Sequence, residues 1–206
     1  LGDVYKRQAN HLSTTIALYL YGRTFFLEDK PVAKEHKVAF DYFVGQAKKY
    51  WLKLANRQSQ AHLAVALNRL TERQAARAIM ASIDERSVED EELGRFWRDT
   101  ERSWWWYRAP IETQAMMIEA FDEVLNDKDA VEACKVWLLK QKQTQDWKTT
   151  KATADAVYAL VLRGSDLLAS DELVKVSLAD MAPIKPENVE AGTGYYEKRF
   201  VGPEIK

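Results

Sequence analysis

Cysteine, proline and glycine are scarce in this sequence, and each shortage excludes something. Of 206 residues only Cys134 is a cysteine, so no disulfide forms within the chain. There is no proline between Pro31 and Pro110 and no glycine between Gly45 and Gly94, which leaves a long interval without the usual helix breakers. No apolar run approaches the roughly 18 residues of a membrane span, so we expect no transmembrane segment.

The sequence also lacks an excess of positive or negative charge. Lys and Arg together number 30 and Asp and Glu 31, for a net charge of −1, which excludes the basic surface typical of a nucleic-acid-binding protein. The apolar share of 47% excludes a disordered chain and is enough for a sizeable core. The histidines His11, His36 and His62 do not stand at metal-ligand spacings, so we predict no metal site and no cofactor.

The segment 104–125 (WWWYRAPIETQAMMIEAFDEVL) is the one around which the other elements are expected to pack. Pro110 suits the first turn of a helix, where its missing N–H costs nothing, and Glu112 places a negative charge near the helix N-terminus. Apolar residues from Ile111 to Leu125 then cover most of the helix surface. A helix that is apolar nearly all round is a buried one, so an inner layer of helices with an outer layer around it is predicted.

Other helices are predicted from periodicity and end signals. Gly22 should end the first, and Thr71 should be the N-cap of a helix whose apolar stripe is Ala76, Ile79, Met80 and Ile83. The polar segment Asp84–Thr100 is expected to be an exposed connection. The helix that Gly22 ends is expected over Asn10–Tyr21. Further helices are expected over Lys34–Leu54, Ser59–Leu70, Asp127–Gln141 and Thr149–Leu162.

An internal repeat indicates how these helices are arranged. Trp106 precedes Ala115 by the same distance that Trp147 precedes Ala156, an offset of 41 residues between the two copies. Repeats of about 40–50 residues with two helices each are typical of α-hairpin arrays. Because an alanine-rich helix is followed each time by a more strictly amphipathic one, we favour an α/α toroid over an open solenoid.

Beyond the helices the pattern changes. Leu173–Leu178 alternates as a half-buried strand does, Gly194–Phe200 is a second candidate strand, and glycine and proline become frequent. We therefore predict three parts: residues 1–8 as a disordered, non-native tail, 9–165 as the helical domain, and 166–206 as a linker with the first strands of an incomplete β domain. The tail, LGDVYKRQ, resembles a translated sequencing-adapter string.

Three stretches, in order, resemble the bacterial branch of the alpha-2-macroglobulin family. They are LGRFW at Leu93–Trp97, WWWY followed by APIETQAMMIEAF at Trp104–Phe121, and WLLKQKQ followed by WKTTKATADAVYAL at Trp137–Leu160. The match is to the helical, thioester-type domain and to the entry into the following β domain. The fold it implies is mainly α: an α/α toroid of helical hairpins, incomplete at its N-terminal side, running into the first strands of a β-sandwich.

The resemblance implies a module of a large endopeptidase inhibitor that encloses peptidases after bait cleavage and defends the cell envelope. Its partners would be neighbouring β domains of the same polypeptide and, through the whole protein, target peptidases. Its location would be periplasmic, cell-surface or secreted. The family's thioester needs Cys-x-Glu-Gln, but Cys134 is followed by Lys135, Val136 and Trp137, so this chain holds no thioester. Cys134 is instead expected in the core.

The alternative function is an enzyme, because α/α toroids also host carbohydrate-active and terpenoid enzymes. Glu112, Glu119, Asp122 and Asp155 would then supply a carboxylate pair roughly 5–10 Å apart in a cleft lined by tryptophan. We expect no catalytic residues. Glu119 and Asp122 resemble a solvated helix edge and Asp155 a helix cap, so the four carboxylates are predicted to be scattered, exposed or capping. His62 is predicted to be hydrogen-bonded or to face solvent.

Overall fold

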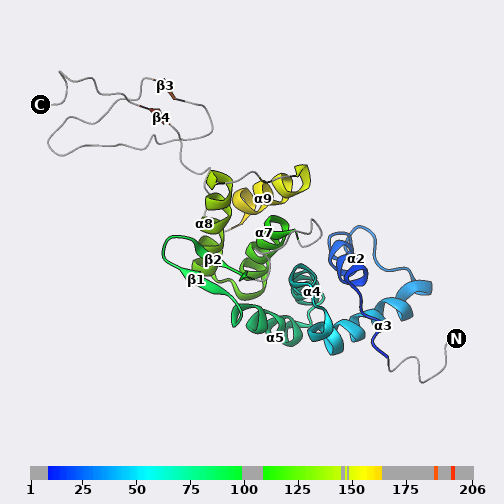
Figure 1. The fold of residues 1–206 in the computed structure, drawn as a ribbon. Coiled ribbons are helices and arrows are strands. Elements are labelled where there is room, and N and C mark those ends of the chain that lie inside the picture. The colour runs from blue at the N-terminus through cyan, green and yellow to red at the C-terminus, as the bar shows by residue number, and fades with distance from the viewer. Residues whose placement is uncertain are drawn as a thin grey trace, which may run out of the picture. The chain divides into compact units, whose positions relative to one another are not determined.

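The computed structural model describes residues 9–98, 109–144, 147, 149–163, 188–189 and 196–197, and its chain divides into two compact units, Leu1–Leu167 and Leu168–Lys206 (Figure 1). The helices of the first unit are α2 (Thr14–Thr24), α3 (Lys34–Tyr50), α4 (Arg57–Arg69), α5 (Arg73–Asp84), α7 (Pro110–Ala120), α8 (Lys128–Thr144) and α9 (Thr150–Leu162). Two short turns extend them, the 3₁₀ turn η1 (Trp51–Lys53) and the π-helical turn η3 (Phe121–Leu125). The prediction of a mainly helical chain is confirmed.

The helices form two layers. In the inner layer α2 packs on α4, α4 on α7, and α7 on α9, so four helices lie side by side in a row. In the outer layer α3 contacts α2 and α4, α5 packs on α4, and α8 packs on α7. Figure 1 shows α3, α5 and α8 around the outside of α4 and α7. Each chain-adjacent inner and outer pair, α4 with α5 and α7 with α8, is a helical hairpin.

Burial follows this division in the two middle helices of the inner layer, α4 and α7, and in the outer helix α5. Every residue from Ser59 to Leu67 in α4 and from Ile111 to Ala120 in α7 is buried, as expected of helices surrounded by others. In α5 only the predicted stripe is buried, namely Ala76, Ile79, Met80 and Ile83. The inner–outer alternation predicted from composition is therefore observed in two successive hairpins.

The central helix α7 begins and ends by local backbone geometry. Ala109 has φ 40°, Pro110 takes the first helical position, and the carbonyl of Ala109 accepts from the N–H of Thr113 at 2.8 Å. After η3, Asn126 adopts the left-handed conformation with φ 53°, which ends the helical backbone. The side chain of Gln114 fixes α7 to its neighbours, because its Nε2 donates to the carbonyls of Arg95 and Cys134 at 2.7 and 3.1 Å.

Both predicted helix-end signals are wrong, and α2 begins at Thr14, with Ser13 as its N-cap, instead of at Asn10. Helix α2 continues through Gly22 to Thr24, because nothing in the surrounding structure requires the conformational freedom of glycine there. Thr71 does not cap α5. It follows the end of α4 in a left-handed conformation, φ 65°, and Glu72 occupies the N-cap position of α5 instead.

The segment expected as an exposed connection is instead an antiparallel hairpin with a buried side. Strands β1 (Val88–Asp90) and β2 (Gly94–Phe96) pair, and β2 packs on α8. Phe96 stacks on Trp137 at 6.3 Å between ring centroids, and Trp97 stacks on Phe121 at 6.2 Å. The indole of Trp97 also donates to the carbonyl of Ile83 at 2.9 Å. The polar residues misled the prediction because they gather in β1 and the turn, while the aromatic end of the segment enters the core.

The second unit contains one described pair of strands. Strands β3 (Asn188–Val189) and β4 (Tyr196–Glu197) are antiparallel. Strand β4 falls inside the predicted strand 194–200. The predicted strand at 173–178, the tail 1–8 and the tryptophans at 104–106 lie outside the described residues, so the superposition of Trp106 on Trp147 stays a prediction.

Candidate functional site

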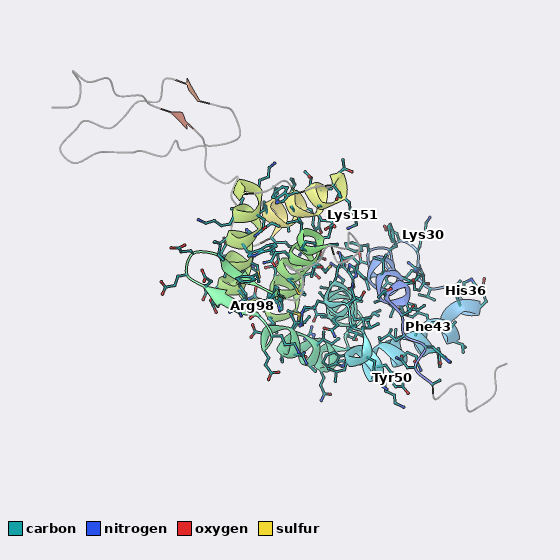
Figure 2. All side chains as sticks on the ribbon, in the orientation of Figure 1. Lys30, His36, Phe43, Tyr50, Arg98 and Lys151 are labelled. Atoms are coloured by element: carbon teal, nitrogen blue, oxygen red, sulfur yellow. The ribbon has the colours of Figure 1, made fainter. Side chains whose placement is uncertain are left out.

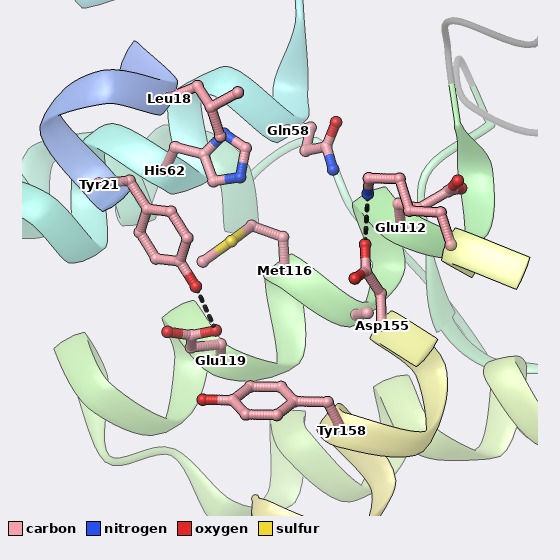
Figure 3. A pocket seen from close by; sticks show the side chains of 11 residues that line it. Leu18, Tyr21, Gln58, His62, Glu112, Met116, Glu119, Asp155 and Tyr158 are labelled. Carbon is pink, nitrogen blue, oxygen red and sulfur yellow. Dashed lines mark hydrogen bonds and ion pairs between the residues drawn. The ribbon is translucent and has the colours of Figure 1, made fainter. Parts of the chain in front are cut away.

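All four inner helices contribute to one pocket of about 320 Å³ (Figure 3). Helix α2 supplies Leu18 and Tyr21, α4 supplies Gln58 and His62, and α9 supplies Lys151, Asp155 and Tyr158. Helix α7 contributes four residues on one face, Glu112, Ala115, Met116 and Glu119. Only the packing of the row brings these side chains together, since they come from segments spread over most of the helical unit.

The aromatic wall of the pocket is a stacked pair from α2 and α4. The rings of Tyr21 and His62 lie 4.7 Å apart at an interplanar angle of 29°. His62 is 9% exposed, and its Nδ1 is buried with no hydrogen-bond partner among the described residues. Burial is the main cause that lowers the pKa of His62 to about 4, with the positive charge of Lys151 adding to it. His62 is therefore neutral at physiological pH. At Nδ1 the structure differs from the expectation of a hydrogen-bonded or solvent-facing histidine, because α4 is enclosed at this position.

A network of charges closes one end of the pocket around Glu119. Its carboxylate accepts from the hydroxyl of Tyr21 at 2.8 Å and pairs with Arg69 at 2.7 Å and Arg163 at 3.3 Å. Both arginines also pair with Glu123, at 2.6 and 2.7 Å. Burial raises the pKa of Glu119, against the opposing effects of the Tyr21 hydrogen bond and the arginines. With three donors on a side chain that is 4% exposed, Glu119 holds α2, α4 and the C-terminal end of α9 on α7.

Two further carboxylates lie at the other end of the pocket, and they differ in whether a neighbouring cation pairs with them. Asp155 pairs with Lys151 one turn earlier on α9, at 2.5 Å. Glu112 is 8% exposed and has no hydrogen-bond or ion-pair partner among the described residues. Of the three carboxylates that line the pocket, Glu112 is thus the one that remains available to a ligand.

The structure corrects what was predicted for the four candidate carboxylates. Glu112 and Glu119 are buried at one pocket instead of lying scattered on the surface, and Asp155 joins them there. Asp155 is not a helix cap; Thr149 caps α9 through a 3.0 Å bond from the N–H of Ala152. Asp122 is absent from the pocket lining and faces Lys128 and Arg163. A carboxylate on an all-round apolar helix has to be buried, and that signal was present in the sequence for Glu112 and Glu119.

Other residues considered from sequence lie away from the pocket. Cys134 is fully buried, as expected, and burial raises the pKa of its thiol. His36 is exposed on α3 (Figure 2), and exposed His11 interacts through Nδ1 with the hydroxyl of Tyr42 at 2.5 Å. Among the described residues, no three His, Cys, Asp or Glu side chains are grouped to hold a metal ion. Within the same residues, no helix combines the length and apolarity needed to cross a bilayer.

No family is shown by comparison. No protein-family model matches the sequence, and searches of curated proteins and of solved structures found no match either. The function is therefore argued from the fold and the pocket. Sequence reasoning missed Tyr21, Arg69, Lys151, Tyr158 and Arg163, because each is an ordinary surface-type residue until the helices pack.

Proposed function

We propose that this chain is the helical, thioester-type module of a large peptidase inhibitor of the alpha-2-macroglobulin kind, with no thioester of its own. The observation that carries the proposal is the pair of successive hairpins in which an enclosed helix, α4 or α7, precedes an amphipathic one, α5 or α8. That arrangement suits part of an α/α toroid. The strands β3 and β4 in the second unit suit the start of a following β-sandwich.

The stretches that resemble the family have structural roles, which favours a docking module. Gly94 approaches α8 closely, and Phe96 and Trp97 fill the core beside it. Trp147 is buried, and its indole donates to the carbonyl of Leu138 at 3.3 Å. Residues used in this way preserve a shape.

The surface of the row offers places for such docking. Apolar side chains are exposed on the helices at both its ends, Leu18 and Tyr19 on α2 and Val157 and Val161 on α9. In the proposal they contact neighbouring β domains of the same polypeptide, and the parent acts at the cell envelope, in the periplasm or outside the cell. Inhibition then arises from a conformational change that follows bait cleavage.

The enzyme alternative rests on the three carboxylates at one pocket. A hydrolase of this kind needs an acid and a base that are both free to act. Glu119 is held by three donors and Asp155 by Lys151, which leaves Glu112 alone. None of the described lining residues is a tryptophan. The geometry thus favours the module over the enzyme.

The test uses the polypeptide that contains this chain, mixed with an active endopeptidase. Trapping predicts that hydrolysis of a large substrate such as casein falls while hydrolysis of a small chromogenic peptide is retained. A Cys134→Ser variant should trap equally well, since the buried thiol has no part in the mechanism. Unchanged casein hydrolysis at an excess of the polypeptide would overturn the proposal. Glycosidase activity that Glu112→Gln abolishes would replace it with the enzyme.

A further inference from the structure

The unpartnered carboxylate of Glu112 in the pocket calls for an explanation. The residue is mostly enclosed, but its carboxylate oxygens are not among the fully buried, unpartnered atoms of the described residues, so they stay accessible where Glu112 lines the pocket. Glu112 is 8% exposed, lines a pocket of about 320 Å³, and has no ionic partner among the described residues. A pocket of this size lies at the lower end of the roughly 300–1,000 Å³ range of small-ligand sites. The arrangement suits a ligand that brings its own positive charge.

The charges around the pocket favour a cation over an anion. Among the described residues, Glu112, Glu119 and Asp155 line it, against one cation, Lys151. Lys151 is already paired with Asp155, and the two arginines that bind Glu119 are not among the lining residues. An anion would meet Glu112 without a free positive partner. His62 repels neither a cationic nor an anionic ligand at neutral pH, because its pKa of about 4 keeps the ring uncharged.

The rest of the lining favours an alkyl chain behind the charge. Leu18, Ala115 and Met116 are apolar, and Tyr21 and Tyr158 present aromatic rings, which also attract ammonium groups. Figure 3 shows Met116 between the end with Tyr21 and Glu119 and the end with Glu112 and Asp155. A slender chain lying along Met116 would place a terminal ammonium at Glu112.

We propose that this pocket binds a protonated alkylamine of the kind carried by a lysine side chain, with Glu112 as its counter-ion. The ligand's methylene groups lie against Leu18, Met116 and the ring of Tyr21. The site does not depend on the inhibitor proposal, since the pocket belongs to the helical array whatever the parent protein does.

The experiment measures binding to the full chain by ligand-observed NMR, with n-butylamine and with lysine capped at both backbone ends. The matched negative probe is the same capped lysine acetylated on Nζ, which keeps the alkyl chain and loses the charge. We expect saturable binding of both amines and none of the acetylated probe. Tighter binding of the capped lysine assigns the site to a polypeptide side chain, and tighter binding of butylamine assigns it to a free amine.

Two substitutions at the pocket, Glu112→Gln and Lys151→Met, should change amine binding in opposite directions. Glu112→Gln should weaken amine binding about tenfold or more, the effect expected when one charged contact is lost. The control Glu35→Gln removes the same charge from the exposed first turn of α3 and should change nothing. Lys151→Met, at a side chain that is 66% exposed, frees Asp155 and should tighten binding several-fold. Equal binding of the acetylated probe, or no tightening in Lys151→Met, would overturn the proposal even if Glu112→Gln failed to fold.

Discussion

The hydroxyl of Tyr21 donates a hydrogen bond of 2.8 Å to the carboxylate of Glu119, a residue 98 positions away in the sequence. This contact joins the first helix of the inner row to the third, beside the stack of Tyr21 on His62. Burial and the neighbouring Glu119 together raise the pKa of Tyr21, so the phenol stays protonated and remains a donor. The same bond therefore lies at the end of the pocket and helps to satisfy the buried carboxylate of Glu119.

Tyr21→Phe should destabilise the helical unit by about 1–2 kcal/mol, because it removes a hydrogen bond to a charged, buried acceptor while keeping the ring. Urea unfolding followed by circular dichroism measures the change. The matched control is Tyr19→Phe on the same helix, whose side chain is 50% exposed, and it should fall within about 0.5 kcal/mol of the unmodified protein. Equal effects of the two substitutions would mean that the Tyr21 hydroxyl contributes nothing to stability.

Arg69→Met should cost roughly 2–4 kcal/mol, since it leaves Glu119 and Glu123 with Arg163 as their shared guanidinium partner. Adding Glu119→Gln should recover part of that loss, because the uncompensated charge is then removed. A double-mutant cycle on the free energies of unfolding measures the coupling. Arg77→Met, at an exposed position of α5, is the control for removing an arginine. Additive losses at Arg69 and Glu119 would contradict the network.

His62 should make the unit less stable in mild acid. Its pKa is about 4 in the folded protein and about 6.5 when unfolded, so the unfolded state binds more protons between these values. The stabilisation by neutral His62 is fully present above about pH 6.5 and is lost as the pH falls toward 4. At pH 5 the loss in the free energy of unfolding is about 2 kcal/mol. His62→Phe should keep the stack on Tyr21 and lack this part of the pH dependence. Unfolding curves at pH 7.5 and 5 provide the comparison, and parallel losses in both proteins would refute it.

Gly94 and Gly45 should respond in opposite directions to alanine. Gly94 has φ 74°, and a Cβ there would lie 2.2 Å from the carbonyl oxygen of Ala133, so Gly94→Ala should cost roughly 2–4 kcal/mol. Gly45 lies within α3 with nothing near a new Cβ, so Gly45→Ala should stabilise by about 0.5–1 kcal/mol. Melting temperatures of the two variants, each compared with the unmodified protein, test this: Gly94→Ala should melt lower and Gly45→Ala higher. A neutral Gly94→Ala would mean that the close contact of β2 with α8 is not required.

Periodicity was enough to predict which segments are helices and which of them are enclosed. The stripe from Ala76 to Ile83 and the all-round apolar surface of α7 are local properties, because helix geometry alone decides which side chains share a face. The burial of Cys134 followed from its place on such a stripe. Local signals failed at Gly22, which continues the helix as an ordinary residue would, and at Thr71, which takes a left-handed conformation after α4 instead of capping α5.

The pocket and the charge network around Glu119 depend on tertiary structure. Nothing near Tyr21 in sequence indicates Glu119, whereas the pair of Lys151 with Asp155 is local, since the two residues are one turn apart on α9; only its place beside Glu112 is tertiary. Whether a carboxylate is a solvated surface group, a committed ion-pair partner or a free counter-ion depends on the groups within a few ångströms. Those groups come from four helices, and their positions are decided only when the helices pack into one row.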